Sequence, residues 1–461
     1  MTCFHHQKSS DRPLGAPERL TGANMATPPP SRCSFFVQKK NRFCKMVPGS
    51  GRSFCGEHAT MEEGVSSRIT CPLDPKHTVA QQNLEKHLKK CNSREKPRPV
   101  YYVENINAGR VDKDQELPEV SLAERSRAEL ESLVEKLKAA AEGLQQDMED
   151  RTLSHPVLQG ELSDPKNGGS AHKHLKQQAS LLGHLQELGL LSRGRCFVEF
   201  GAGRGKLSHW IHRALQNPEG QGIAMESSQD LQLLLVERCC TRFKVDGKHQ
   251  GSADPFERLQ VDIQHLDLSK VPVLREKALP LVGVGKHLCG AATDLALRCL
   301  LDTAGPRPDT QPLPKRLRGP EPGSDTGPVL GLAVALCCHH RCEWRHYVGQ
   351  QFFLQRGLGP AEFSAFCRMS SWATCGPPAN RSGAANRSGA AEDHEEAEQM
   401  AGLGRFWSVA EREHLGRLCK LLIDSGRRDF LRTRGFSSRL IGYADAEVTL
   451  ENVLLTALSS S

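Results

Sequence analysis

Three glycines that alternate with other residues form the stretch of this chain best suited to hold a ligand. Phe197–His209 reads FVEFGAGRGKLSH, so an apolar run leads to Gly201, Gly203 and Gly205, and a helix-like segment follows over 206–216. Glycines permit a tight turn and close approach of a ligand to the backbone, and the N-terminus of a following helix offers unpaired N–H groups. The pattern predicts a nucleotide-type cofactor site; the alternative is a turn whose glycines serve packing alone.

Acidic residues near this turn narrow the kind of cofactor. Glu199 precedes it in E-F-G-A-G-x-G, which resembles the first motif of Rossmann-like S-adenosylmethionine methyltransferases more than the G-x-G-x-x-G of dehydrogenases. A carboxylate there suits an ammonium group, such as the methionine end of that cofactor. Glu237 is expected to bind the ribose hydroxyls and Asp262 the adenine amino group. A salt bridge to Arg238 or Arg242 is the alternative for Glu237, and a turn role is the alternative for Asp262.

Cysteines and histidines near the N-terminus have the composition of two zinc sites, because thiolates and imidazoles are the ligands of tetrahedral zinc. The first group is spaced C-x10-C-x10-C-x2-H and consists of Cys33, Cys44, Cys55 and His58. The second is spaced C-x5-H-x9-H-x3-C and consists of Cys71, His77, His87 and Cys91. The segment that contains the first group is short and has few apolar residues for a core, so it needs a metal or another cross-link.

The second zinc pattern is the stronger of the two. His87 and Cys91 lie four residues apart on an expected helix over 79–90 and therefore share a face, while Cys71 and His77 are expected in the preceding loop. Basic residues make this module suited to an RNA backbone, although a solvated basic face explains any one of them. They are Arg68, Lys76, Lys86, Lys89 and Lys90.

Candidate catalytic residues lie at the C-terminal end of one expected strand, 281–290, and just after another, 329–336. They are Lys286 and His287, and His339 and His340. A lysine acts as a base only when its pKa is lowered, whereas histidine titrates near neutrality, and the sequence does not rank them. The CCHHRC segment at 337–342 could bind metal or form a wall of the active site. We favour the wall, because adjacent residues on a strand point to opposite faces.

Composition limits the class of protein. The 461 residues favour two or three domains, and a hydrophobic content of 38% with a mean hydropathy of −0.48 describes a protein with enough apolar residues for a sizeable core. A net charge of +7 is compatible with nucleic acid without being diagnostic of it. We expect no membrane span and no secretion signal. The odd count of 17 cysteines favours metal ligands and free thiols over disulfides, and so the cytosol or the nucleus.

The pattern along the chain predicts an α/β domain with smaller modules before it. The expected divisions are a disordered extension at 1–30, a CCCH-type zinc module at 31–60, a CHHC-type zinc finger at 66–93, a linker and amphipathic helix at 94–170, and a catalytic domain at 171–461 with flexible inserts near 303–327 and 377–404. We expect the leucine stripe within 118–148 to pack on its own domain, with a short coiled coil as the alternative. Residues 154–170 read as a loop. Besides the strands named above, we expect strands at 233–236, 259–263, 440–443 and 453–458 and helices at 172–190, 291–300 and 409–434, which together make a seven-stranded sheet.

Several longer motifs resemble one family, the eukaryotic tRNA 2′-O-methyltransferases that modify nucleotide 4 of the acceptor stem. These motifs are FVEFGAGRGKLSHW, LVER…TRFKVDGKH, GKHLCGAATDLALRCL, ALCCHHRCEWRHYVG and MSSWATCG. The two cysteine and histidine modules match the pair of zinc modules of that family. The resemblance covers about 31–92 and 172–458, with an insert at 217–232 beside the Glu237 strand as a departure. It implies a Rossmann-like domain that transfers methyl from S-adenosylmethionine to a ribose 2′-hydroxyl of tRNA.

Two further classes of function stay open beside this one. The chain could methylate a protein or a small molecule, which the basic zinc modules weigh against. It could also be a zinc-dependent RNA-binding protein whose Rossmann domain is inactive, which the intact glycine turn and Glu199 weigh against. Binding of the cofactor separates the last class from the other two.

Overall fold

The computed structural model describes most of the chain. The described residues are 32–37, 42–56, 58, 68–91, 93–94, 97–109, 121–216, 230–239, 256–302, 327–374 and 406–460. They fall into two compact units, Met1–Arg98 and Pro99–Ser461. The predicted disordered extension at 1–30, the insert at 377–404, nearly all of the insert at 303–327, and Arg242 lie outside the described residues.

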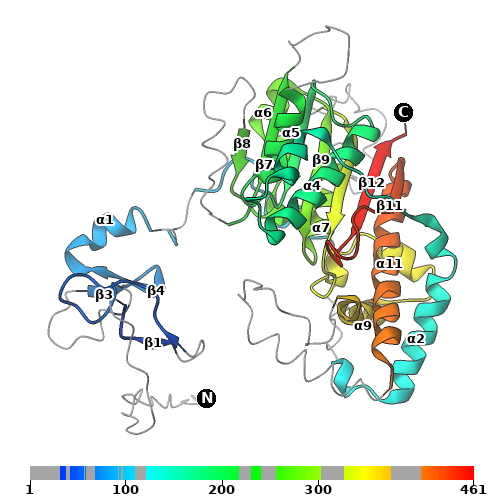
Figure 1. The fold of residues 1–461 in the computed structure, drawn as a ribbon, viewed down its shortest axis with the longest axis horizontal. Helices are drawn as coiled ribbons and strands as arrows, with labels where there is room; N and C mark the ends of the chain where they lie inside the picture. Colours follow the sequence, from blue (N-terminus) through cyan, green and yellow to red (C-terminus); the bar gives the residue numbers. More distant parts are fainter. Residues whose placement is uncertain are drawn as a thin grey trace, which may run out of the picture. The chain divides into compact units, whose positions relative to one another are not determined.

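The described residues of the first unit form two small antiparallel hairpins and one short helix (Figure 1). Strands β1 (Phe36–Val37) and β2 (Arg42–Phe43) pair, as do β3 (Arg68–Cys71) and β4 (Asp74–Ala80), and α1 (Leu84–Leu88) follows. The predicted helix over 79–90 is therefore wrong at its start, because Val79 pairs with Ile69 inside the hairpin. His77 likewise lies in a strand and not in a loop.

An eight-stranded sheet forms the centre of the second unit, in the order β5-β11-β12-β10-β9-β6-β7-β8. The five strands from β8 to β10 run parallel, β12 is antiparallel to its neighbours β10 and β11, and β5 is parallel to β11. In chain order the strands are β5 (Met148–Asp150), β6 (Arg195–Phe200), β7 (Leu231–Val236), β8 (Phe256–Leu259), β9 (Leu281–Leu288), β10 (Val329–Leu336), β11 (Phe436–Gly442) and β12 (Val453–Ser459). The seven predicted strands are all present, and β5 adds an eighth. The third of them ends at Leu259, so its predicted range of 259–263 is wrong.

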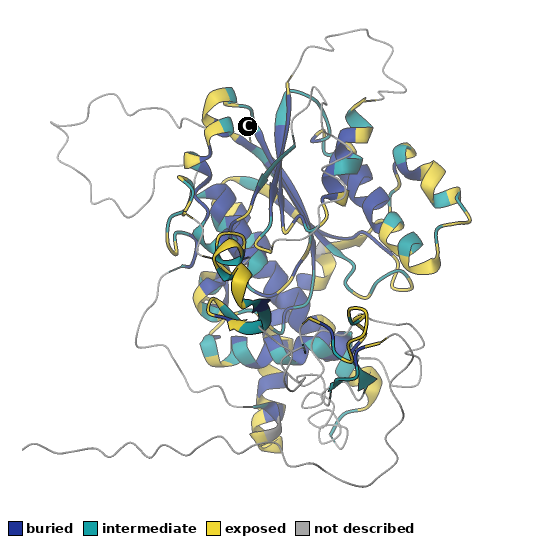
Figure 2. Ribbon diagram, turned by 90° about the vertical axis from the view of Figure 1, so that its left-hand side faces the viewer, coloured by how far each residue is buried: buried dark blue, intermediate teal, exposed yellow. Residues whose placement is uncertain are grey.

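Helices cover both faces of this sheet, which accounts for the burial of most residues of the central strands β6, β7, β9 and β10 (Figure 2). Alternate residues of β6 point to opposite faces: Phe197 packs with one group of helices, and Val198 and Phe200 pack with the other. The first group is α4 (Gly169–Glu187) and α5 (Lys206–Gln216). The second group is α2 (Arg127–Ala141), α6 (Pro272–Lys277), α7 (Ala292–Leu301), α9 (Pro360–Met369) and α11 (Val409–Thr433), with the short α8 (Gln350–Leu354) beside them.

The leucine stripe belongs to α2, and it packs inside the second unit as predicted. Ser126 and Glu129 form a capping box at the start of α2, and Leu130, Leu133 and Leu137 are buried against α9 and α11. Met148 does not continue this stripe, because it begins β5 and is 38% exposed.

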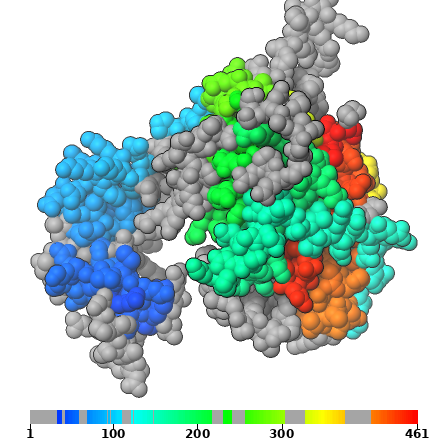
Figure 3. Space-filling model, turned by 45° about the horizontal axis from the view of Figure 1, so that its top comes forward, coloured from blue at the N-terminus to red at the C-terminus, as the bar shows by residue number. Residues whose placement is uncertain are grey.

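Segments expected to be linker or loop also pack on this unit. Asn107 Nδ2 donates to the carbonyls of Ile263 and Leu266 at 2.6 and 2.8 Å, so the linker is shorter than the predicted range. The range 154–170 contains α3 (Gln159–Ser163), and Leu158 just before it is fully buried. Ser180 Oγ of α4 donates to the Tyr443 carbonyl at 2.6 Å, which places the turquoise helix beside the red C-terminal segment in Figure 3.

A buried cluster of charges joins three elements of this unit. Arg427 of α11 donates to Asp294 of α7 at 2.6 Å and to Asp424 at 2.9 Å, and all three side chains are at most 2% exposed. His339, which follows β10, lies 2.7 Å from the same Asp424. In the part of the chain that the structure describes, none of the helices has the length and apolar character needed to cross a membrane.

We expect Arg427→Met to lower the free energy of unfolding by about 3–5 kcal/mol, because removing the guanidinium leaves two buried carboxylates without their cation. Urea unfolding of the full chain followed by circular dichroism measures this change. Arg417→Met on the same helix is the matched control, since Arg417 forms an exposed pair with Glu413 that contributes at most about 1 kcal/mol. Equal unfolding midpoints for the two variants would show that the buried cluster is not needed for stability.

Candidate functional site

The carboxyl ends of four neighbouring strands bring most of the predicted site residues to one edge of the sheet. β6 lies between β7, which follows it in the chain, and β9, so the order of strands reverses at this point. In open α/β sheets, ligands bind in the crevice outside the carboxyl ends of the strands at such a switch point. The glycine turn leaves β6, Glu237 follows β7, Lys286 and His287 end β9, and His339 and His340 follow β10.

The glycine turn has the backbone that its sequence predicts. Gly201, Gly203 and Gly205 have φ angles of 62°, 49° and 73°, in the left-handed region that side chains rarely adopt. A Cβ at Gly201 would lie 2.7 Å from the side chain of Leu288 in β9, so glycine at this position also avoids a steric clash. Helix α5 starts at Lys206, directly after the turn, and directs its N-terminus to this edge.

Glu199 is buried under the turn, with 4% of its surface exposed. Its Oε2 atom accepts hydrogen bonds from both the backbone N–H (2.9 Å) and the hydroxyl of Ser208 in α5. Burial raises the pKa of Glu199 to about 7, and the bonds from Ser208 reduce that rise. A positively charged ligand group near this carboxylate would offset the cost of its burial.

Glu237 and Asp262 both accept hydrogen bonds from backbone N–H groups. Glu237 accepts from the N–H of Gly203 at 2.8 Å and from that of Cys239 at 3.0 Å. Asp262 accepts from the N–H of Gln264 at 3.0 Å and so caps a short 3-10 helix, which is its turn role. Arg238 pairs with Asp262 at 3.4 Å, so the salt bridge offered as an alternative for Glu237 goes to the other acid. Contacts of either acid with a cofactor stay predictions.

Lys286 and His287 lie where the β9 strand is irregular. The pairing of β9 with β10 shifts at His287, whose φ of 63° is in the left-handed region although it is not glycine. Such bulges and strained residues re-aim side chains and are frequent at functional sites. Burial lowers the pKa of Lys286 to about 8, aided by the charge of Lys206 and opposed by Glu199. Burial and the neighbouring Lys286 lower the pKa of His287 to about 4.

His174 belongs to this site, and the sequence did not predict it. Its Nδ1 atom lies 3.2 Å from Nζ of Lys286, and its ring meets that of His287 edge-on at 6.1 Å. Partial burial and the cations Lys286 and Lys206 lower the pKa of His174, which favours the neutral form of the ring. The signal available was the run HKHLK at 172–176, which places a basic and imidazole-rich turn at the start of α4.

The two candidate histidines after β10 have different surroundings. His339 is 1% exposed and binds Asp424, so in this conformation it cannot meet a substrate hydroxyl. Its contacts instead support a role in positioning the segment. His340 is half-buried and shares a side-chain hydrogen bond with Cys338.

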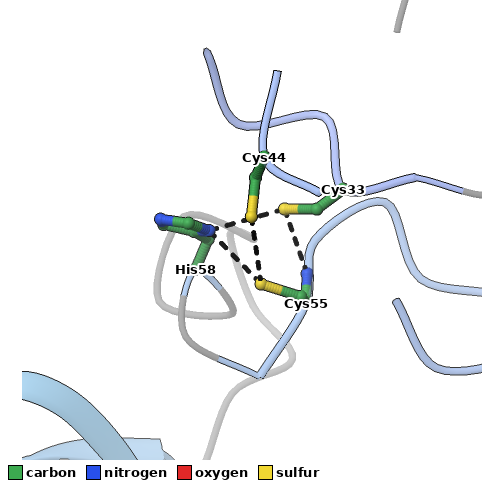
Figure 4. A group of neighbouring side chains, drawn as sticks. All are labelled: Cys33, Cys44, Cys55 and His58. Atoms are coloured by element: carbon green, nitrogen blue, oxygen red, sulfur yellow. Dashed lines mark hydrogen bonds between the residues drawn. The ribbon is translucent and has the colours of Figure 1, made fainter. Parts of the chain in front are cut away.

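The first predicted metal group comes together in the first unit, as Figure 4 shows. The ligand atoms of Cys33, Cys44, Cys55 and His58 all lie within 4.8 Å of one another. Nδ1 of His58 is 3.5 Å from the sulfur of Cys33 and 3.3 Å from that of Cys55, and Phe35 stacks on the imidazole. Two thiolates on one zinc ion are about 3.8 Å apart, and the sulfurs of Cys44 and Cys55 are 4.0 Å apart.

The second metal group also comes together, with its ligand atoms within 4.8 Å. The sulfurs of Cys71 and Cys91 are 3.8 Å apart, and the sulfur of Cys71 is 3.2 Å from Nε2 of His87. His77 faces its partners with Nε2, and its Nδ1 lies 3.5 Å from Asp74, the kind of outer contact that orients a metal-binding imidazole. Both groups therefore have the donor set and spacing of a tetrahedral zinc site.

The fold and these sites define a class: an α/β protein with a glycine-turn ligand site at a sheet edge and two small zinc-type modules. Comparison with protein families makes this specific. The model for Methyltransferase TRM13 matches residues 176–458, and the chain belongs to this methyltransferase family. The models for the CCCH zinc finger in TRM13 protein and for the U11-48K-like CHHC zinc finger match residues 31–59 and 68–92.

Curated relatives agree with this assignment over nearly the whole chain. A mouse protein named tRNA:m(4)X modification enzyme TRM13 homolog is 48% identical over 95% of this chain and 96% of its own length. The human protein of the same name is 49% identical over 94% of this chain and 95% of its own length. The fission yeast (Schizosaccharomyces pombe) tRNA:m(4)X modification enzyme TRM13 is 30% identical over 85% of this chain and 95% of its own length.

We expect Cys55→Ser and Cys71→Ser each to lose about one zinc ion per chain, and the double variant about two, because a structural site that loses one of four ligands binds far more weakly. Elemental analysis of the full chain after gel filtration measures the content. Cys239→Ser, which changes an exposed cysteine outside both groups, is the matched control and should retain all of its zinc. Unchanged zinc in Cys71→Ser would contradict the ligand set of the second module.

Proposed function

We propose that this chain transfers the methyl group of S-adenosylmethionine to the ribose 2′-hydroxyl of nucleotide 4 in the acceptor stem of tRNA. The observation that carries the proposal is the sheet edge that joins the glycine turn, Glu199 and Glu237 to the Lys286–His174 pair. Family membership supports methyl transfer, and the names of the relatives support tRNA and position 4.

The residues at this edge fit S-adenosylmethionine in the manner of a Rossmann-like methyltransferase. Gly203 has no atom beyond its neighbours closer than 4.0 Å to a built Cβ, so there is open space above the turn for a ligand. Glu237 is the acid at the end of the second parallel strand, where such folds bind ribose hydroxyls. Buried Glu199 would hold the ammonium group. When bound, the cofactor supplies an electrophilic methyl carbon on a positively charged sulfur.

Basic side chains in both units supply the charge that an RNA backbone requires. Lys86, Lys89 and Lys90 of the second zinc module are exposed, and so are Arg204 and Lys206 beside the glycine turn. Phosphate contacts by lysine and arginine provide most of the affinity of such proteins without reading sequence. The zinc modules would thus add tRNA affinity, and the sheet edge would perform the chemistry.

Lys286 is the residue that we propose as the base. A ribose hydroxyl is a weak nucleophile until its proton is removed, and a lysine with its pKa lowered to about 8 is a competent acceptor near neutral pH. Once protonated, Lys286 donates to Nδ1 of neutral His174, which stabilises the new charge. The remaining acceleration comes from holding the hydroxyl in line with the methyl carbon.

Lys286→Ala should lower kcat by about 10²–10⁴-fold with tRNA affinity little changed, the usual effect of removing a general base. In the wild type, kcat should rise with pH and level off above about 8, because the unprotonated amine is the active form. Single-turnover transfer of labelled methyl across pH measures both.

Lys286→Arg distinguishes a base from a residue that only holds a phosphate. Arginine keeps the positive charge but stays protonated, so a base would not be restored by it. Full turnover of Lys286→Arg, or a wild-type rate that falls above pH 8, would assign Lys286 to phosphate binding.

The whole activity is tested by transfer of labelled methyl from S-adenosylmethionine to total tRNA, followed by nuclease mapping and alkaline hydrolysis. We expect label at position 4 in an alkali-resistant dinucleotide, because a methylated 2′-oxygen cannot attack its phosphate. Gly203→Asp should lose transfer, since it places a carboxylate beside Glu237 at a left-handed position. Gly143→Asp makes the same change at another left-handed glycine with open space and should retain activity.

Other outcomes of this experiment assign another function. Cofactor binding without label in tRNA would indicate a protein or small-molecule substrate. No cofactor binding by folded chain would leave a zinc-dependent RNA-binding protein with an inactive domain.

A further inference from the structure

A third group of metal-type ligands lies in the second unit, away from both zinc modules in the sequence. It consists of Cys289, which follows β9, and of Cys337 and Cys338, which follow β10. The three sulfur atoms lie within 4.8 Å of one another, and those of Cys289 and Cys337 are 3.3 Å apart. Three thiols from two separate strand ends thus meet at one point.

Adjacent cysteines of the CCHHRC segment were not expected to share one metal ion, but the structure brings their sulfur atoms together. Adjacent residues on a strand point to opposite faces, but β10 ends at Leu336, so Cys337 and Cys338 are no longer on the strand. Beyond the strand, the backbone can turn both side chains to one side. The third ligand comes from the end of the neighbouring strand, which no local pattern could reveal.

Contacts around the group fix the two segments relative to each other. The N–H of Gly290 donates to the carbonyl of Cys338 at 3.1 Å. Gly290 has a φ of 59°, and a Cβ there would lie 2.6 Å from the carbonyl oxygen of Arg341, so only glycine allows this approach. His340 forms a side-chain hydrogen bond with the thiol of Cys338. The thiols are therefore held together by the backbone before any ligand binds.

A metal ion explains this arrangement better than packing or a disulfide. Clustered thiols gain little from burial here, because Cys289 is exposed and the other two are half-buried. A disulfide can join only two of the three, and the sulfurs of Cys289 and Cys337 are farther apart than the roughly 2.05 Å of that bond. A zinc ion at about 2.3 Å from each sulfur would bind all three, with sulfur separations near 3.8 Å.

We propose that Cys289, Cys337 and Cys338 form a third zinc site, with three thiolate ligands and a fourth position open to solvent. His340 orients Cys338 through its hydrogen bond and is not itself a ligand, in the way that outer residues orient metal ligands. The ion would join the ends of β9 and β10 close to Lys286 and His287. This site is independent of the substrate proposed above.

The test is the zinc content of the full chain, reconstituted with zinc under reducing conditions and freed of excess metal by gel filtration. We expect about three zinc ions per chain in the wild type and about two in Cys337→Ser and in Cys338→Ser. Cys71→Ser should also fall to about two, and Cys71→Ser with Cys337→Ser to about one, because the sites are separate. Cys239→Ser should keep about three, and circular dichroism confirms that each variant is folded.

Cobalt substitution gives a second measurement that does not depend on activity. Subtracting the spectrum of cobalt-substituted Cys337→Ser from that of the wild type isolates the proposed site. The difference should show the thiolate-to-cobalt absorption of a site with three sulfur ligands. A wild type with about two zinc ions, or a Cys337→Ser variant with the wild-type content, would overturn the proposal. Peptide mapping that finds Cys289 joined to Cys337 in such a two-zinc protein would overturn it as well and would identify a redox pair.

Discussion

Burial of Arg427 between two carboxylates is the interaction that fixes the segment after β10 at the carboxyl edge of the sheet. The guanidinium connects α7 through Asp294 with α11 through Asp424, and its Nη2 atom also lies 3.2 Å from the sulfur of Cys342. His339 contacts the same Oδ1 atom of Asp424 that Arg427 binds. The CCHHRC segment that follows β10 is therefore held at its third and last residues, because His339 and Cys342 both contact this cluster. The side chains between and beside these anchors can then be exposed without being loose.

Local sequence was sufficient to predict the parts of the sheet whose residues are buried on both faces. β10 runs over 329–336 as expected, because a continuous run of eight apolar residues suits a parallel strand buried between two layers of helices. β8 was misplaced because it is the last strand of the sheet and has half-buried Glu257 and Arg258 where apolar residues were sought. The hairpin strand β4 was missed for a related reason: metal ligands, and not an apolar face, determine its fold.

The candidate site divides in the same way. The turn glycines and the two cysteine and histidine groups were predictable, because each is needed by a local backbone shape or a known ligand spacing. His174 was not, since 112 residues separate it from Lys286 and only the packing of α4 on the sheet brings the two together. The meeting of Cys289 with Cys337 has the same origin, because the parallel pairing of β9 and β10 sets it. Sequence reasoning thus identifies the ligands of a site more readily than the partners that tune them.

The first zinc module has one more consequence. Its buried apolar residues are Cys33, Cys44 and Cys55, with Phe35, Val37 and Phe54 packed around them, so the metal ligands are themselves the core. For such a module folding and coordination are a single equilibrium, and its stability follows the concentration of free metal. While the site is nearly saturated, each tenfold fall in the concentration of free zinc lowers the free energy of unfolding of the module by about 1.4 kcal/mol. Depletion of free zinc would therefore unfold this module, while the second unit would stay folded on its own apolar core.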